Sequence, residues 1–259
     1  MKRLFSILLC ITLVLCLFSG CNEEEGPYVP TGDALEQEGS NITTPPQTPS
    51  EQNFSMVYYP GSSLNPYTAS DYTNRTLLPL LYQSLFNVDR DYNATPILCE
   101  SYRVSKDMKT YTIFPAKALF SDGTPLTAAD VAASLNAAKE ENSYYSGRFL
   151  HITSITAEGG AVIIQLDTAC ENLPVLLDIP IVKAEDGAAS NPIGTGPYVL
   201  DNSISGKRLR RQAAWWCRSK ASLVVTAAYI PLVEATSPSQ IRDQFEFGDV
   251  GIVCPDPGS

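Results

Sequence analysis

The side chains that usually carry out acid–base or nucleophilic catalysis are sparse in this sequence. His151 is the only histidine in 259 residues, and it directly precedes Ile152, where a strand is expected to begin. Such catalysis needs a nucleophile beside a base, or a pair of carboxylates, and no spacing among the Asp and Glu residues singles out a pair. We therefore interpret His151 as a structural residue and predict that the protein is not an enzyme.

The seven cysteines do not form a metal-binding pattern. Three lie in or next to the apolar stretch 4–18, and no C-x-x-C spacing occurs among the other four, Cys99, Cys170, Cys217 and Cys254. With a single histidine, a four-ligand zinc site is not expected, and we predict no metal and no other cofactor. Disulfides would be permitted outside the cell, but we favour free, buried thiols.

An arginine-rich stretch, 208–211, lies shortly before Trp215 and Trp216, a combination that could contact phosphates and stack on bases. The whole chain argues against nucleic acid, because 28 Asp and Glu residues outnumber 18 Lys and Arg residues and give a net charge of −10. A chain this acidic is a poor binder of nucleic acids and anionic membranes. We interpret the two tryptophans as packing residues and exclude nucleic acid as a partner.

The N-terminus has the pattern of an export signal. Lys2 and Arg3 precede the apolar stretch 4–18, which is shorter than the roughly 20 residues of a membrane-spanning helix. Residues 17–21, LFSGC, resemble a bacterial lipobox, in which the cysteine is lipidated and becomes the new N-terminus, although Phe18 stands where leucine is more usual. We predict a lipoprotein signal peptide over 1–20 and lipidation of Cys21. An ordinary secretory signal with a chance cysteine is the alternative.

The next segment, 21–53, is acidic, rich in Pro, Ser and Thr, and nearly free of large aliphatic side chains, so it cannot bury a core. We predict a disordered tether with a reach of about 30 Å. Its sequon at Asn41 fits eukaryotic glycosylation, which a bacterial envelope would normally not use.

Folded sequence is expected from residue 54. The stretch 54–59 has strand composition and ends at Pro60-Gly61, and apolar residues at helical spacing from Leu77 to Leu85 predict a helix with Thr76 as its N-cap. Further segments follow in order: a hairpin over 98–104 and 110–114, a strand over 161–166, a short helix over 174–177, an extended stretch over 179–182 and a strand over 198–200.

The stretch 120–131, FSDGTPLTAADV, combines a turn and a helix start. Asp122-Gly123 is a turn dipeptide, Thr127 is a good N-cap, and Asp130 is placed to complete a capping box. We expect this stretch to fix the junction between a strand and a helix that runs through Val131 and Leu135, without chemistry of its own.

Three segments in this order resemble the family 5 solute-binding proteins of bacterial ABC importers, which include oligopeptide, dipeptide and nickel receptors. They are LNP at 64–66 with LYQSLF at 81–86, the stretch 98–113 leading into FSDGTPLTAADVAAS, and NPIGTGPY at 191–198. The resemblance covers roughly residues 54–250. One departure is Pro115-Ala116-Lys117 before the turn, from which we expect a shortened lead-in strand.

The resemblance implies a mixed α/β fold: the N-terminal lobe of a type II periplasmic-binding-protein-like structure over 54–259, incomplete, with the second lobe largely absent. It implies capture of oligopeptides or dipeptides for an ABC permease, at the outer face of the bacterial cytoplasmic membrane or in the periplasm. The family places the segment 70–74 at the wall of the ligand cleft, so Tyr72, Thr73 and Asn74 are the expected ligand-binding residues. An equally good interpretation is that they only cap and pack the following helix.

Two other classes of function stay open. A non-transporting, lipid-anchored interaction or sensory protein derived from one lobe would fold stably without binding small ligands. An envelope hydrolase would be favoured only by turnover that depends on specific carboxylates. The sequence does not name the ligand, and one histidine does not exclude the nickel branch.

Overall fold

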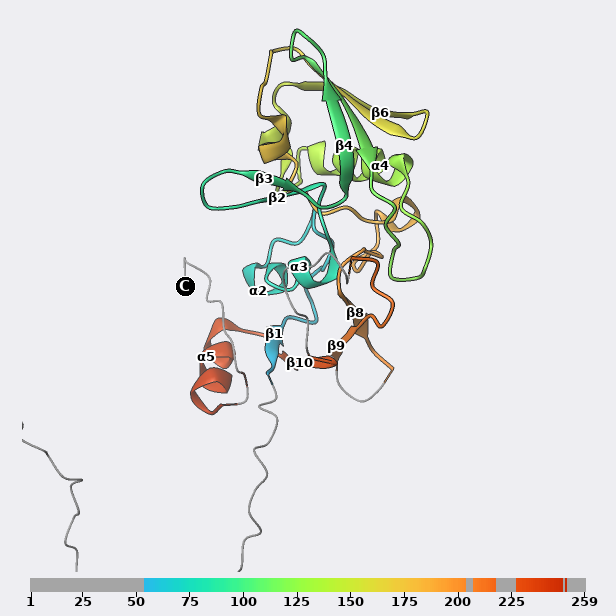
Figure 1. Ribbon diagram of the computed structural model, residues 1–259. Coiled ribbons are helices and arrows are strands. Elements are labelled where there is room, and N and C mark those ends of the chain that lie inside the picture. The colour runs from blue at the N-terminus through green and yellow to red at the C-terminus, as the bar shows by residue number, and fades with distance from the viewer. Residues whose placement is uncertain (1–53, 204–206, 218–226, 249, 251–259) are drawn as a thin grey trace, which may run out of the picture. The chain divides into compact units, whose positions relative to one another are not determined.

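The computed structural model describes residues 54–203, 207–217, 227–248 and 250. The signal peptide, the tether and the Cys21 lipidation site predicted above lie outside these residues, as does Cys254. Within the described part, the strands form two four-stranded sheets and one two-stranded hairpin (Figure 1). In that part of the chain, no helix has the length and hydropathy of a membrane span.

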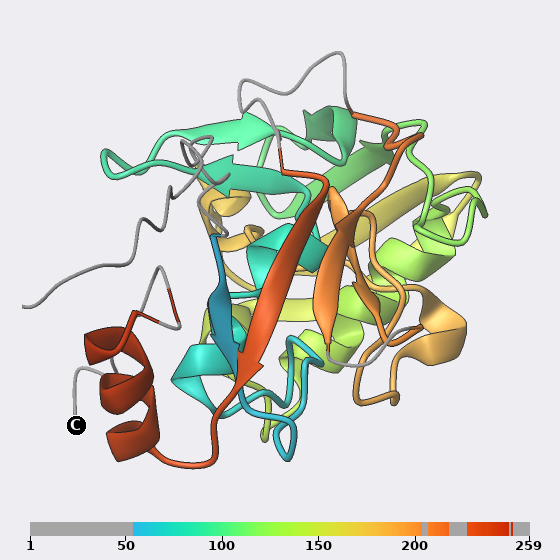
Figure 2. The same ribbon diagram turned by 90° about the horizontal axis from the view of Figure 1, so that it is seen from below.

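The first sheet joins the start and the end of the described chain. Its strands are β1 (Met56–Tyr58), β10 (Tyr229–Glu234), β9 (Arg208–Arg211) and β8 (Tyr198–Asp201), in that order. β1 runs parallel to β10, with Met56 opposite Leu232, and the other pairs are antiparallel (Figure 2). The strands predicted near 54 and 198 are confirmed, whereas β9 and β10 were not predicted.

The second sheet is antiparallel, with the order β4 (Cys99–Val104), β5 (Thr110–Pro115), β7 (Ala161–Leu166) and β6 (Ile152–Glu158). Helix α4 (Ala128–Lys139) packs on this sheet through β6 and β7, and its Val131 and Leu135 side chains are fully buried. The predicted hairpin and the strand 161–166 are confirmed. β5 continues to Pro115, which pairs with Cys99, so the expectation of a shortened strand is wrong.

The junction before α4 contains the predicted capping box. Thr127 Oγ1 accepts a hydrogen bond from the Asp130 backbone N–H at 3.3 Å, and Asp130 Oδ2 accepts one from the Thr127 backbone N–H at 2.9 Å. The other Asp130 oxygen accepts from the Ala184 N–H, and Ser134 exchanges hydrogen bonds with the Val182 backbone in both directions. The junction therefore both starts the helix and fastens the extended segment near 182.

The helix predicted from Leu77 to Leu85 is wrong in its bounds and its cap. Two short helices form instead, α2 (Tyr72–Arg75) and α3 (Leu78–Leu81), and Thr76 ends α2 by donating its hydroxyl to the Thr73 carbonyl. The chain leaves α3 at Tyr82, because the Leu81 carbonyl, which a longer helix would need, accepts from the Gly196 N–H at 2.9 Å. The apolar side chains of this stretch are buried as expected, but α3 packs near β8 instead of continuing as one long helix.

The remaining elements are small. β2 (Phe86–Val88) and β3 (Ala94–Pro96) form an unpredicted hairpin, and 3₁₀ turns occur at η2 (Ser146–Phe149), η3 (Leu173–Leu176) and η4 (Ala184–Asp186). The turn η3 lies where a short helix was predicted. Helix α5 (Pro238–Glu246), also unpredicted, packs its buried Ile241 in a small cluster with Val57, Ala235 and Val250.

Candidate functional site

Helix α2 carries two of the three residues expected to bind ligand at its surface. Asp71 caps it, with its side chain accepting from the Asn74 backbone N–H at 2.8 Å. Tyr72 has 41% of its surface exposed, and Thr73 is half-buried. The ring of Tyr72 is therefore available for an apolar or aromatic contact with a ligand.

The structure gives Asn74 a different place from that expected for a ligand contact. Its side chain is fully buried: Oδ1 accepts from the Tyr59 N–H at 2.8 Å, and Nδ2 donates to the carbonyls of Tyr59 and Ser62 at 2.9 and 3.2 Å. Both amide protons and the carbonyl oxygen are thus engaged by the loop that follows β1. Asn74 acts as a positioning residue that holds α2, which agrees with the alternative interpretation of this segment.

Sequence reasoning missed two tyrosines that lie beside α2. Tyr144 and Tyr145 belong to the loop after α4, which is held close to residue 67 by a hydrogen bond from the Tyr144 N–H to the Tyr67 carbonyl. The Arg75 guanidinium, on α2, lies over the Tyr144 ring at 3.4 Å from its centroid, and the two tyrosine rings meet edge to face at 5.2 Å. Tyr145 is buried, but Tyr144 is 64% exposed and presents an aromatic surface next to α2.

The two arginines beside these tyrosine rings differ in their ion pairing. Arg148, at 5.1 Å from the Tyr145 centroid, forms an ion pair with Asp178. Arg75 has no ion-pair partner among the described residues. Its Nη1 donates to the Ala69 carbonyl at 3.3 Å, and its side chain also interacts with the Tyr145 phenol through its charge and a hydrogen bond. Burial raises the pKa of the Tyr145 phenol, and the nearby Arg75 charge opposes that rise. We refer to Tyr72, Arg75 and Tyr144 as the α2 surface.

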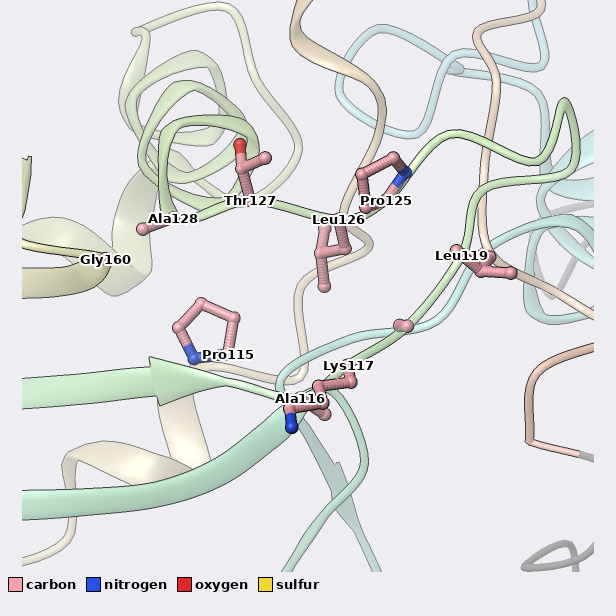
Figure 3. A pocket seen from close by; sticks show the side chains of 10 residues that line it. Pro115, Ala116, Lys117, Leu119, Pro125, Leu126, Thr127, Ala128 and Gly160 are labelled. Atoms are coloured by element: carbon pink, nitrogen blue, oxygen red, sulfur yellow. The ribbon is translucent and has the colours of Figure 1, made fainter.

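A shallow hollow of about 360 Å³ lies elsewhere, where β5 ends and α4 begins. Figure 3 shows its lining, residues 115–119 and 125–128 with Gly160, which is mainly apolar. Lys117 and Thr127 carry the polar side chains among these lining residues, and the Thr127 hydroxyl already takes part in the capping box. The hollow offers no converging set of polar groups, so we do not take it as the functional site.

The other chemically capable residues occupy structural positions. His151 Nδ1 lies 3.1 Å from an oxygen of exposed Asp167. In the described part of the chain, no three His, Cys, Asp or Glu residues are grouped as metal ligands. Cys99, Cys170 and Cys217 are free thiols, and burial raises the pKa of Cys99 to about 11. The indole N–H groups of Trp215 and Trp216 bond to the Thr195 carbonyl and the Gln83 side chain, in agreement with a packing role.

The two sheets and the three sequence segments described above are those of a bacterial solute-binding protein. The model of the bacterial extracellular solute-binding proteins, family 5, matches residues 93–257, and the chain belongs to this family. Members of the family are non-enzymatic components of transporters, which agrees with the prediction that the chain is not an enzyme.

Among curated relatives, the glutathione-binding protein GsiB of Escherichia coli O1:K1 is 29% identical over 170 residues, which cover 60% of this chain and 33% of the relative. GsiB of Salmonella choleraesuis is 28% identical over 205 residues, covering 73% and 36%. The matched part of the chain thus spans about a third of the length of these relatives.

Solved structures show the same fold at low identity. NikA from Brucella suis in complex with Fe(III)-EDTA has a TM-score of 0.60 at 24% identity, covering 76% of this chain and 42% of that one. The pheromone receptor PrgZ has a TM-score of 0.60 at 22% identity, covering 77% and 46%. The mixed α/β class is therefore confirmed, and the coverage agrees with a single lobe of a periplasmic-binding-protein fold. The domain boundaries stay predictions.

Proposed function

We propose that the protein is the lipid-anchored, extracytoplasmic substrate-binding component of an ABC importer for oligopeptides or dipeptides. The observation that carries the proposal is the α2 surface, in which exposed Tyr144 lies against the Arg75 guanidinium and exposed Tyr72 lies three residues before Arg75 on α2. Membership of a family of non-enzymatic transporter components supports capture and delivery without bond chemistry. GsiB, which binds glutathione, itself a tripeptide, and PrgZ, with its peptide-binding mode, support peptides as the ligand class.

In this proposal, α2 is a rigid platform. The buried Asn74 amide fixes the helix to the loop after β1, so Tyr72 is presented in a constant orientation. Aromatic side chains contribute contact area at low conformational-entropy cost, because they have only two side-chain torsions. Tyr72 and Tyr144 would contact the ligand, while Asn74 holds α2, and with it Tyr72, in place. The loaded protein would then deliver its ligand to the permease.

We expect Tyr72→Ala to weaken peptide binding about fivefold, the effect of losing roughly 1 kcal/mol of aromatic contact. Binding of a pool of tripeptides would be measured by saturation-transfer NMR, which detects weak binding. The matched control is Tyr92→Asn, because Tyr92 is a more exposed tyrosine in the β2–β3 turn and asparagine tolerates its positive φ of 61°. Equal losses in both variants, or no binding by the unchanged protein, would contradict the proposal.

We expect Cys21→Ser to release the protein from the membrane, because serine offers no thiol for lipidation. The measurement is the distribution of the protein between membrane and soluble fractions of the bacterial host. Cys16→Ser, which changes a cysteine inside the apolar stretch, serves as the control and should leave the protein attached. Undiminished membrane association of Cys21→Ser would refute the predicted lipid anchor.

A further inference from the structure

We propose that Arg75 is an anchoring residue for a carboxylate group of the ligand. This inference rests on the proposed function, because it assigns a chemical requirement to the same α2 surface. It is carried by the geometry of the guanidinium and by the distribution of charges around it.

The guanidinium of Arg75 is held in one orientation on two sides. Its central carbon, Cζ, lies over the Tyr144 ring at 3.4 Å from the ring centroid, and Nη1 donates to the Ala69 carbonyl at 3.3 Å. Arginine has five N–H donors in a fixed planar fork, so the bonds to the Ala69 carbonyl and the Tyr145 phenol still leave donors for another acceptor. A guanidinium that is already oriented loses less freedom when it binds an anion.

The charge balance of the surroundings favours an anionic ligand. Six other basic side chains each lie within 4 Å of a carboxylate oxygen, in the pairs Arg148–Asp178, Lys183–Asp122, Lys207–Glu234, Arg208–Asp201, Arg210–Asp201 and Arg242–Asp243. Arg75 has no such partner among the described residues, although it is half-buried and the chain carries an excess of acidic residues. Half-buried Lys139 and exposed Arg103 also have no such partner there, but Arg75 is the one that lies against the exposed Tyr144 ring. Arg75 is thus a positively charged group whose natural counter-ion, a carboxylate, is not supplied by the neighbouring side chains.

The position of the Tyr144 ring beside the Arg75 guanidinium indicates from which side the anion would be bound. Arginine and carboxylate groups pair through two parallel hydrogen bonds, which are stronger than neutral ones and fix direction. The Tyr144 ring covers one face of the guanidinium, so the carboxylate is expected to approach its N–H edge. The exposed tyrosines beside it would contact the apolar part of the same ligand.

The test compares tripeptides that differ only in their terminal group. One pool, made from Ala, Ser, Val and Phe, has free C-terminal carboxylates, and the second pool is the same set as C-terminal amides. Binding of each pool is measured by saturation-transfer NMR for the unchanged protein, Arg75→Gln, Arg75→Lys and the control Arg103→Gln. Arg103 is an exposed arginine on β4 of the second sheet, and its guanidinium lies 5.3 Å from the Phe114 ring centroid.

The unchanged protein and Arg103→Gln should bind the acids at least tenfold more tightly than the amides, and Arg75→Gln should bind both pools alike. Arg75→Lys should retain part of the preference, because the charge remains but the planar fork is lost. A ratio of acid to amide affinity is insensitive to a general disturbance of the surface, since both pools would suffer equally.

The outcomes separate this inference from the proposed function. Equal binding of acids and amides by the unchanged protein would overturn the role of Arg75 and leave peptide binding standing. If neither pool binds but succinate and glutarate bind in an Arg75-dependent way, peptides are excluded and the carboxylate anchor is supported. Failure of every carboxylate probe would overturn both.

Discussion

Gly196→Ala is expected to destabilise the protein by about 3 to 5 kcal/mol, or to prevent folding altogether. A Cβ atom at residue 196 would lie 2.5 Å from the Leu80 oxygen and 2.6 Å from the Leu81 oxygen, and still closer to the Leu81 carbonyl carbon. These neighbours are backbone atoms, so no side chain can rotate away to make room. The same contact carries the hydrogen bond from the Gly196 N–H to the Leu81 carbonyl that ends α3.

Urea denaturation followed by tryptophan fluorescence would measure this loss, because Trp215 donates to the adjacent Thr195 carbonyl. Gly61→Ala is the matched control: a Cβ there meets nothing within 4 Å, and its φ is not positive. We expect that variant to stay within about 0.5 kcal/mol of the unchanged protein. A Gly196→Ala protein as stable as Gly61→Ala would show that the 196 segment does not pack on α3 in this way.

Asn74→Ala is expected to lower the free energy of unfolding by about 3 kcal/mol. The substitution removes three hydrogen bonds and leaves the Tyr59 N–H and the Ser62 carbonyl without this partner, whereas the Tyr59 carbonyl keeps its bond from the Ser62 N–H. An unsatisfied buried polar group costs about 1 to 3 kcal/mol, and partial access of water to this loop reduces the sum. Because α2 loses its attachment, peptide binding should fall together with stability.

The comparison variant is Asn136→Ala, in which an exposed asparagine on α4 loses one hydrogen bond, to the Ile155 carbonyl. Its effect should stay within about 0.5 kcal/mol, since water replaces the lost partner and alanine favours the helix. Thermal and urea unfolding of both variants measure the difference. If Asn74→Ala is as stable as Asn136→Ala and only binding is lost, Asn74 contacts the ligand directly.

Local patterns predicted the second sheet and its helix well. The polar connector 105–109 marks the β4–β5 turn, and Thr127 with Asp130 starts α4, because these devices act between residues close in the chain. The helix at Leu77 failed for the opposite reason. Its apolar spacing is helical, but a glycine more than a hundred residues later takes the Leu81 carbonyl and redirects the chain.

The candidate site could be predicted only in part. The segment 70–74 came from the resemblance to the family, and Tyr72 is exposed there, but no local signal indicates that Asn74 faces inward. Arg75 and Tyr144 are separated in sequence by α3, the β2–β3 and β4–β5 hairpins and α4, so their contact is a product of the tertiary fold. The adjacent tyrosines at 144–145 were the one sequence feature that could have drawn attention to this loop.

The parallel pairing of β1 with β10 also determines the order in which the protein can fold. Met56 opposes Leu232, so the first sheet cannot close until almost all of the described chain has been synthesised or exported. The second sheet with α4 is built from residues 99–166 and can form earlier, because its contacts are nearer in sequence. We expect a chain that acquires its last central strand so late to be slow in completing its native structure, a kinetic property that would suit a protein that crosses a membrane unfolded.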